Sequence, residues 1–223
     1  MTFNSVIEDI KIVIKSIGKR GLLPTLTMVW HEYSFDSKYG IRTKGRQAQN
    51  KGKLESTNSK GGKEYQGYSY FLFRKFMNRL AIDFSQSVFV DFGSGKGRVL
   101  IMASEYNFKR IIGLEYAEDL FLESQINIGS TKVNASNIHI EHEDAAAYSI
   151  PEDANVLFFF NPFDEKVMES VLKNVDASME RTPRKIYIVY TSPTFETCFD
   201  ERGYEKVFEL HNGAKNEGII YRV

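Results

Sequence analysis

Three glycines at alternating positions are the feature of this sequence most suited to binding a ligand. Gly93, Gly95 and Gly97 follow an apolar run that ends in Asp91, and an apolar-periodic segment begins at Val99. Glycine lets the backbone turn sharply and approach a ligand closely, because it has no Cβ. The first N–H groups of the helix that follows are unpaired and favour an anionic group. The pattern therefore predicts a strand, a tight turn and a helix that together bind a nucleoside-like cofactor.

The spacing of these glycines indicates which cofactor class to expect. The dinucleotide pattern G-x-G-x-x-G would need its third glycine where this chain has Arg98. The pattern here is D-x-G-x-G-x-G, which resembles the first motif of the S-adenosylmethionine-dependent methyltransferases with a seven-stranded sheet. The resemblance implies that S-adenosyl-L-methionine is the cofactor, with its methionine and ribose along the glycine turn. The residues that this motif would contribute are Asp91, Gly93, Ser94, Gly95 and Gly97. The alternative is a glycine-rich turn that binds no ligand.

A second acid supports the nucleoside site. The segment Arg110–Glu115 has the pattern of a short buried strand that ends in an acid. Glu115 follows Asp91 by about two dozen residues, close to the ~20-residue offset at which a strand-end acid binds ribose hydroxyls. A carboxylate can accept hydrogen bonds from both hydroxyls at once. A solvated glutamate at the end of a strand is the alternative.

A third strand is expected at 137–144, where Ile138 and Ile140 alternate with polar residues. In the methyltransferase family, the acid after the third strand accepts the adenine amino group, and the next backbone N–H meets the ring. By resemblance, Asp144 and Ala145 take these positions. Glu143 is the competing choice of acid.

The fourth strand leads into the residues expected to hold the methyl acceptor. Val156–Phe160 is a continuous apolar run, typical of a central parallel strand, and Asn161-Pro162-Phe163 follows it. The first and fourth strands are neighbours at the switch point of a doubly wound sheet, so Asn161 should face the glycine turn.

The tripeptide resembles the Asn/Asp-Pro-Pro-Phe/Tyr motif of amino-group methyltransferases, although the second proline is absent. The resemblance implies that Asn161 and the Pro162 carbonyl orient a nitrogen acceptor and that Phe163 stacks on the substrate. The alternative is a simple turn, with Asp164 capping the following helix. No residue pattern identifies a general base, and Glu143, Tyr68 and His31 are the candidates for that role.

The resemblance covers about residues 35–192, including Phe-Asp-Ser-Lys-Tyr-Gly-Ile at 35–41 and Gly67-Tyr68. It is to a widespread bacterial set of largely uncharacterised class I methyltransferases. It implies an α/β fold with a doubly wound, mostly parallel seven-stranded sheet, the Rossmann-like methyltransferase fold. The last three strands are expected at 185–191, 204–210 and 218–223, with a turn at His211-Asn212-Gly213. By resemblance, the final strand inserts antiparallel between the fifth and sixth.

The sequence divides into an extension at 1–66 and a methyltransferase domain at 67–223. Ser5 and Glu8 form a capping-box pattern, which predicts an N-terminal helix that stops near Gly18 and packs on the core. Residues 42–66 are rich in Lys, Gly, Ser and Asn, which predicts a mobile basic loop over the site.

Three tyrosines close that segment or follow it, just before a helix expected at about 70–80. In related methyltransferases the segment before the first strand closes over the cofactor, where an aromatic ring can stack on the sulfonium. Tyr68 is the predicted cofactor contact, and Tyr65 and Tyr70 are the alternatives. Core packing is expected for two of the three.

No metal site is predicted. His139 and His142 would point to opposite faces of a strand, and neither a cysteine nor a third histidine lies nearby in sequence. Cys198 is the only cysteine, which excludes an intrachain disulfide and favours a cytoplasmic, reducing compartment. No signal peptide is recognised, and no run approaches the ~18 apolar residues of a membrane span.

The charge distribution bears on the partner. Residues 1–66 hold 12 Lys and Arg against 6 Asp and Glu, and the remainder holds 17 against 23. A basic extension either binds an anionic partner or lies on its own acidic domain, and we favour the second interpretation. We expect a small-molecule methyl acceptor. The alternatives are a protein (lysine-type) methyltransferase and a non-catalytic cofactor-binding protein, and nucleic acid is disfavoured because no aromatic-interleaved basic patch is present.

Overall fold

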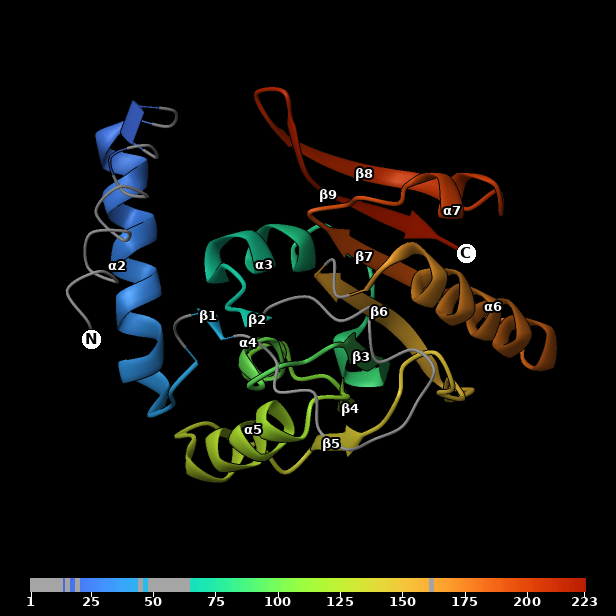
Figure 1. The fold of residues 1–223 in the computed structure, drawn as a ribbon, viewed down its shortest axis with the longest axis horizontal. Coiled ribbons are helices and arrows are strands. Elements are labelled where there is room, and N and C mark those ends of the chain that lie inside the picture. The colour runs from blue at the N-terminus through green and yellow to red at the C-terminus, as the bar shows by residue number, and fades with distance from the viewer. Residues whose placement is uncertain (1–13, 15–16, 19–20, 44–45, 48–64, 161–162) are drawn as a thin grey trace.

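A seven-stranded sheet forms the centre of the molecule in the computed structural model (Figure 1). The model describes residues 14, 17–18, 21–43, 46–47, 65–160 and 163–223. The strands of the sheet are β3 (Val88–Phe92), β4 (Arg110–Glu115), β5 (Ile138–His142), β6 (Ala154–Phe160), β7 (Tyr187–Thr191), β8 (Glu205–Asn212) and β9 (Lys215–Arg222). Their order across the sheet is β5-β4-β3-β6-β7-β9-β8.

The order confirms the predicted doubly wound topology. β3 pairs in parallel with both β4 and β6, so the chain reverses its direction of travel across the sheet at β3. In such sheets a crevice for ligands opens at the carboxyl ends of the strands beside the reversal. β9 runs antiparallel between β7 and β8, as the resemblance implied.

Helices cover both faces of the sheet. They are α2 (Leu22–Tyr39), α3 (Tyr70–Met77), α4 (Arg98–Ser104), α5 (Glu118–Ser130), α6 (Glu165–Arg181) and α7 (Thr197–Asp200), with a 3-10 turn η1 at Phe84–Gln86. One core cluster joins α3, α4 and the end of α2 to one face, and a second joins α6 and α7 to the other (Figure 1). A sheet buried on both faces explains why β3 and β6 consist almost entirely of apolar residues.

The phenylalanines of β6 show how the two core clusters are built. Phe158 packs edge-on against Phe73 of α3, with ring centroids 5.7 Å apart. Phe159 points to the opposite face and stacks on Phe92 of β3 at 4.7 Å. Both side chains are fully buried. The apolar run therefore holds the central strands in place and brings their carboxyl ends side by side.

The N-terminal extension differs in part from the prediction. Ser5 and Glu8 lie outside the described residues, and Gly18, the expected stop, is itself helical. α2 was not predicted, because Pro24 and weak periodicity obscured it; Pro24 falls in the first turn, where its missing N–H costs no helical hydrogen bond. None of the helices in the described ranges is long and apolar enough to cross a membrane.

The basic segment is paired at both of its ends. β1 (Arg46–Gln47) and β2 (Tyr65–Gln66) form a two-stranded antiparallel ribbon, which was not predicted. The greater part of the predicted mobile loop, 44–45 and 48–64, lies outside the described residues. The hairpin near the C-terminus is also longer than predicted. β8 extends through His211 and Asn212, and its turn lies at Gly213, with φ 61°.

Asp164 caps α6, as expected from the sequence. Its carboxylate accepts a hydrogen bond from the Val167 N–H at 3.0 Å. Replacing Asp164 with alanine leaves that N–H unpaired, so we expect a loss of about 1 kcal/mol in the free energy of unfolding. Chemical denaturation measures this change. Asp164→Asn keeps the acceptor and should remain near wild type; an equal loss in both variants would contradict the capping role.

Candidate functional site

The glycine turn connects β3 to α4 in a conformation that other residues rarely adopt. Gly93, Gly95 and Gly97 have φ values of 79°, 55° and 80°. The Gly93 and Ser94 N–H groups donate to the Leu114 carbonyl at 2.9 and 2.8 Å, which joins the turn to β4. The predicted strand, turn and helix are therefore present, and the turn lies at the carboxyl ends of β3 and β4.

Glu115 lies directly beside the glycine turn, at the end of β4. Its Oε2 accepts from the Gly95 N–H at 2.8 Å, and its Oε1 accepts from the Ala117 N–H at 2.8 Å. The side chain is only 4% exposed, and burial raises its pKa, while the Ala117 and Gly95 N–H groups act in the opposite direction. The Tyr116 N–H acts in the same direction as those two groups, so the carboxylate is fixed by the backbone at the junction of β4 and the turn.

Asp91 and Ser94 carry buried polar atoms that the surrounding chain leaves unsatisfied. Asp91 is 2% exposed, and its Oδ2 has no hydrogen-bond partner among the described residues; the same holds for Ser94 Oγ. Burial raises the pKa of Asp91 well above its ordinary value, and the nearby Glu115 carboxylate raises it further. Because native proteins rarely leave buried polar atoms unpaired, these atoms fit a polar ligand at the turn.

The raised pKa of Asp91 has a consequence for stability. An acid whose pKa is raised by folding stabilises the protein below its unfolded pKa of about 3.9 and loses that contribution as pH rises through the folded value. Asp91→Asn removes the buried charge, so we expect a higher melting temperature at pH 7 and a weaker fall in melting temperature as pH rises above about 4. Thermal unfolding between pH 4 and 8 measures both effects. The exposed Glu143→Gln is the control, and a lower melting temperature for Asp91→Asn at pH 7 would contradict this account.

The loop after β5 carries the residues predicted to bind adenine. Ala145 is buried, Asp144 is half-buried and Glu143 is exposed. Asp144 Oδ1 accepts from the Ala146 N–H at 2.9 Å, and the Glu143 N–H donates to the Glu115 carbonyl at 3.3 Å. The second bond ties this loop to the strand end that carries Glu115. The three acids Asp91, Glu115 and Asp144 therefore lie at or just after the carboxyl ends of three neighbouring strands, β3, β4 and β5.

One histidine of β5 packs within the fold, and the other is exposed. His142 Nε2 lies 2.9 Å from the Tyr116 carbonyl, and its ring stacks on Phe121 at 4.9 Å, while His139 is exposed. Within the described ranges, no group of three His, Cys, Asp or Glu side chains could hold a metal ion.

The aromatic residue on the glycine turn is Tyr65. A Cβ added to Gly95 would lie 2.5 Å from two ring carbons of Tyr65, which is 7% exposed. Tyr68, the predicted contact, instead packs on Phe158 and Phe160 of β6, with centroids 5.2 and 4.8 Å away. It also lies near Thr191 at the end of β7. Tyr68 is thus placed at the end of β6, and its role as a cofactor contact stays a prediction.

Tyr70 is the first residue of α3. Its hydroxyl donates to Glu105 Oε2 at 2.6 Å, and its ring packs on Phe35 at 5.3 Å. All three tyrosines are buried, with exposed fractions of 7% for Tyr65, 3% for Tyr68 and 8% for Tyr70. Sequence alone gave no signal that would single out Tyr65.

The predicted acceptor residues are only partly described. Asn161 and Pro162 lie outside the described residues. Phe163 is half-buried and packs against the core cluster on the α6 side of the sheet.

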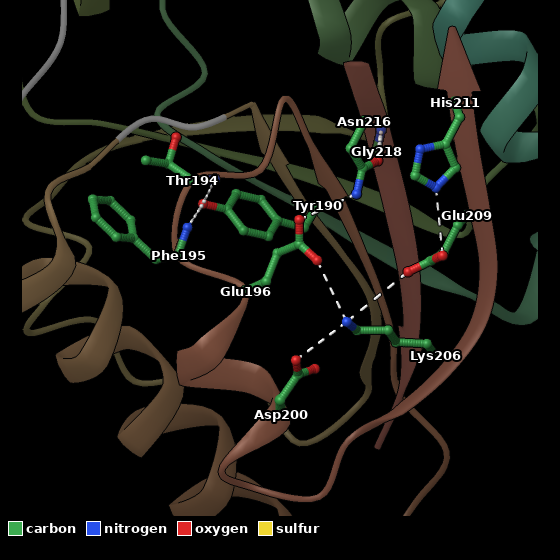
Figure 2. A network of polar contacts seen from close by, with 10 residues as sticks. All are labelled: Tyr190, Thr194, Phe195, Glu196, Asp200, Lys206, Glu209, His211, Asn216 and Gly218. Carbon is green, nitrogen blue, oxygen red and sulfur yellow. Dashed lines mark hydrogen bonds and ion pairs between the residues drawn. The ribbon is translucent and has the colours of Figure 1, made fainter. Parts of the chain in front are cut away.

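A network of polar contacts orders the loop that follows β7, next to the end of β6 (Figure 2). The Tyr190 hydroxyl accepts from the Thr194 and Phe195 N–H groups at 3.0 and 3.2 Å. Glu196 Oε2 binds Lys206 at 3.4 Å, and Lys206 also contacts Asp200 at 3.2 Å. This loop starts at Ser192, whose φ is 48°.

Comparison with known proteins identifies the fold. No family model matches the chain, and no curated protein matches its sequence. Solved structures do match. A SAM-dependent methyltransferase from Aquifex aeolicus has a TM-score of 0.52 at 12% identity, over 68% of this chain and 89% of that one. This chain has the Rossmann-like methyltransferase fold.

Two further structures with this fold are similar to the chain. One is a putative S-adenosyl-L-methionine-dependent methyltransferase from Methanococcus maripaludis, with a TM-score of 0.52 at 17% identity over 68% of this chain and 83% of that one. The other is a SAM-dependent methyltransferase from Leishmania major, with a TM-score of 0.53 at 12% identity over 69% and 71%. In doubly wound sheets of this kind, the ligand crevice lies at the carboxyl ends of the strands beside the reversal, which here are β3 and β6.

Proposed function

We propose that this protein is an S-adenosylmethionine-dependent methyltransferase of a largely uncharacterised bacterial class I family, and that it methylates a nitrogen of a small molecule in the cytoplasm. The observation that carries the proposal is the glycine turn beside Glu115, with the buried, unsatisfied Asp91 carboxylate beneath it. The fold of the solved methyltransferases supports the same reading.

The residues at the crevice fit the parts of this cofactor. Asp91 offers a buried carboxylate to a cationic group, and Ser94 offers a hydroxyl. The Glu115 carboxylate would accept hydrogen bonds from the ribose hydroxyls. Asp144 and the Ala145 N–H would receive the adenine ring, with Glu143 as the competing acid. When bound, the cofactor supplies an electrophilic methyl group on a sulfonium.

The chain itself contributes alignment and the exclusion of water. Asn161 and the Pro162 carbonyl would accept hydrogen bonds from the nitrogen to be methylated and point its lone pair toward the methyl group. The buried ring of Tyr68 packs on the half-buried ring of Phe160 at the end of β6, and Phe163 would contribute an apolar contact to the acceptor. No proton acceptor is assigned, so we expect an acceptor nitrogen that is already unprotonated when it binds.

Calorimetric titration of S-adenosylmethionine tests the cofactor, with Asp91→Ala and Glu115→Ala as site variants. Micromolar binding that both variants lose would support the site. A folded wild-type protein that binds no S-adenosylmethionine would overturn the proposal. Incubation with the methyl-labelled cofactor and cell extract then separates the acceptors: label in the small-molecule fraction supports the proposal, label in protein supports a lysine-type enzyme, and no transfer supports a non-catalytic binding protein.

Asn161→Ala tests the assignment of the acceptor site. Since Asn161 would touch only the acceptor, we expect cofactor affinity to stay within about twofold of wild type, while turnover falls about a hundredfold or more. Calorimetry and labelled-methyl transfer measure the two quantities separately. Turnover equal to wild type would remove Asn161 from the mechanism.

A further inference from the structure

Tyr65 covers the part of the crevice where Glu115 joins the glycine turn. Its ring contacts Gly95 on one side and packs with Ala117 and Leu120 on the other. Gly95 and Ala117 are the same two residues whose N–H groups bind the Glu115 carboxylate. A ligand that reaches Glu115 along the glycine turn must therefore lie against the ring of Tyr65.

Tyr65 is held in this position by Thr43, near the start of the basic segment. Its hydroxyl donates to the Thr43 carbonyl at 2.7 Å. Burial raises the pKa of Tyr65 above its ordinary value, so the hydroxyl keeps its proton at neutral pH. Thr43 is fully buried and is fixed in turn by Asp36, whose carboxylate accepts from the Thr43 N–H at 2.8 Å and from its hydroxyl at 2.7 Å.

Arg98 connects these residues to the glycine turn. It is the first residue of α4, directly after Gly97, and it is 2% exposed. Its Nη1 donates to Asp36 Oδ1 and to Thr43 Oγ1, each at 2.9 Å, and its Nε donates to the Tyr68 carbonyl at 2.9 Å. Its guanidinium also lies 4.2 Å from the centroid of the Phe35 ring. One buried cation therefore binds two segments that are distant in sequence, residues 36–43 and residues 65–68. We call these two segments together the strap.

We infer that docking of the strap and binding of the cofactor are coupled, with Tyr65 as a wall of the cofactor crevice and Arg98 as the positioning residue that holds it there. The inference rests on the proposed function, because S-adenosylmethionine is the ligand concerned. It explains the motif at 35–41 and Gly67-Tyr68: Phe35, Asp36 and the Tyr68 carbonyl are all contacts of Arg98. Thermodynamic linkage is reciprocal. If the docked strap raises the affinity for the ligand by some factor, the bound ligand raises the equilibrium constant for docking of the strap by the same factor.

Two measurements test the coupling, with S-adenosylmethionine and S-adenosylhomocysteine as probes. In the wild-type protein, saturating S-adenosylhomocysteine should slow hydrogen exchange in peptides that cover 36–43 and 65–68 by about tenfold or more. By calorimetry, Tyr65→Ala should weaken S-adenosylmethionine binding by about tenfold, and Tyr65→Phe, which keeps the ring, by less. Phe71→Ala removes an exposed ring from α3 and serves as the matched control.

Variants of Arg98 separate positioning from general stability. Arg98→Met should lose both cofactor affinity and the protection of the strap, and Arg98→Lys should recover part of each, because it keeps the charge opposite Asp36. If Arg98→Met fails to fold, the Tyr65 variants still decide the question. Wild-type binding without protection of the strap, or Tyr65→Ala binding as tightly as wild type, overturns the inference alone. A wild-type protein that binds neither probe overturns the proposed function and the inference with it.

Discussion

Replacing Glu115 with alanine should weaken S-adenosylmethionine binding by about a hundredfold or more. The carboxylate holds the Gly95 and Ala117 N–H groups at 2.8 Å each and is buried. Its removal leaves two buried N–H groups unpaired, at about 1–3 kcal/mol each, and frees the turn from the end of β4. The ligand also loses the acceptor for its ribose hydroxyls. Calorimetry gives the affinity, and circular dichroism confirms the fold.

Glu115→Gln is the matched variant for this prediction. Its amide oxygen can accept from one of the two N–H groups, but its NH₂ group would face the other donor. We expect an affinity between those of wild type and Glu115→Ala. A folded Glu115→Ala protein with wild-type affinity would contradict the assignment of Glu115 to the site.

Gly95→Ala should lower S-adenosylmethionine affinity by about tenfold or more, for two independent reasons. A non-glycine residue at φ 55° costs about 1–2 kcal/mol. The new Cβ would also lie 2.5 Å from the ring of Tyr65 and force it to move. The double variant Gly95→Ala/Tyr65→Ala relieves the clash but keeps the backbone strain, so its loss of binding free energy should be smaller than the sum of the losses of the two single variants.

Gly129→Ala is the control for this substitution. Gly129 lies in α5, and an added Cβ there meets nothing within 4 Å. Alanine at a helical position should stabilise the protein by about 0.5–1 kcal/mol and leave cofactor binding unchanged. If Gly95→Ala bound as well as Gly129→Ala, the turn would not be the site of the ligand.

The parts of the site that depend on local sequence could be predicted. The glycine turn and Glu115 follow directly from an apolar run, a spacing and a terminal acid, and the structure places them together. The order of the strands followed from the resemblance, including the antiparallel position of β9. Such features are recognisable because the residues that determine them lie next to one another in the chain.

The parts that depend on tertiary contacts could not be predicted. Tyr65 and Tyr68 are equivalent by residue type and position in the sequence. Tertiary contacts distinguish them: the Tyr65 hydroxyl donates to the Thr43 carbonyl, and the Tyr68 carbonyl accepts from Arg98. Tyr65 lies on the turn and Tyr68 at the end of β6. Arg98 itself entered the sequence argument only as the residue that interrupts a dinucleotide pattern. The ion pair that it forms joins positions 62 residues apart, which no local pattern reveals.

The position of β9 has a consequence for synthesis in the cell. β9 occupies an interior place in the sheet, yet it follows every other strand of the sheet along the chain. On the ribosome, β7 therefore waits with an unpaired edge, and β8 has no neighbour, until Lys215–Arg222 has left the exit tunnel. Exposed edges of this kind recruit other chains, so the nascent protein is prone to aggregate until β9 has emerged, and a chaperone that covers the edge of β7 would act during that interval.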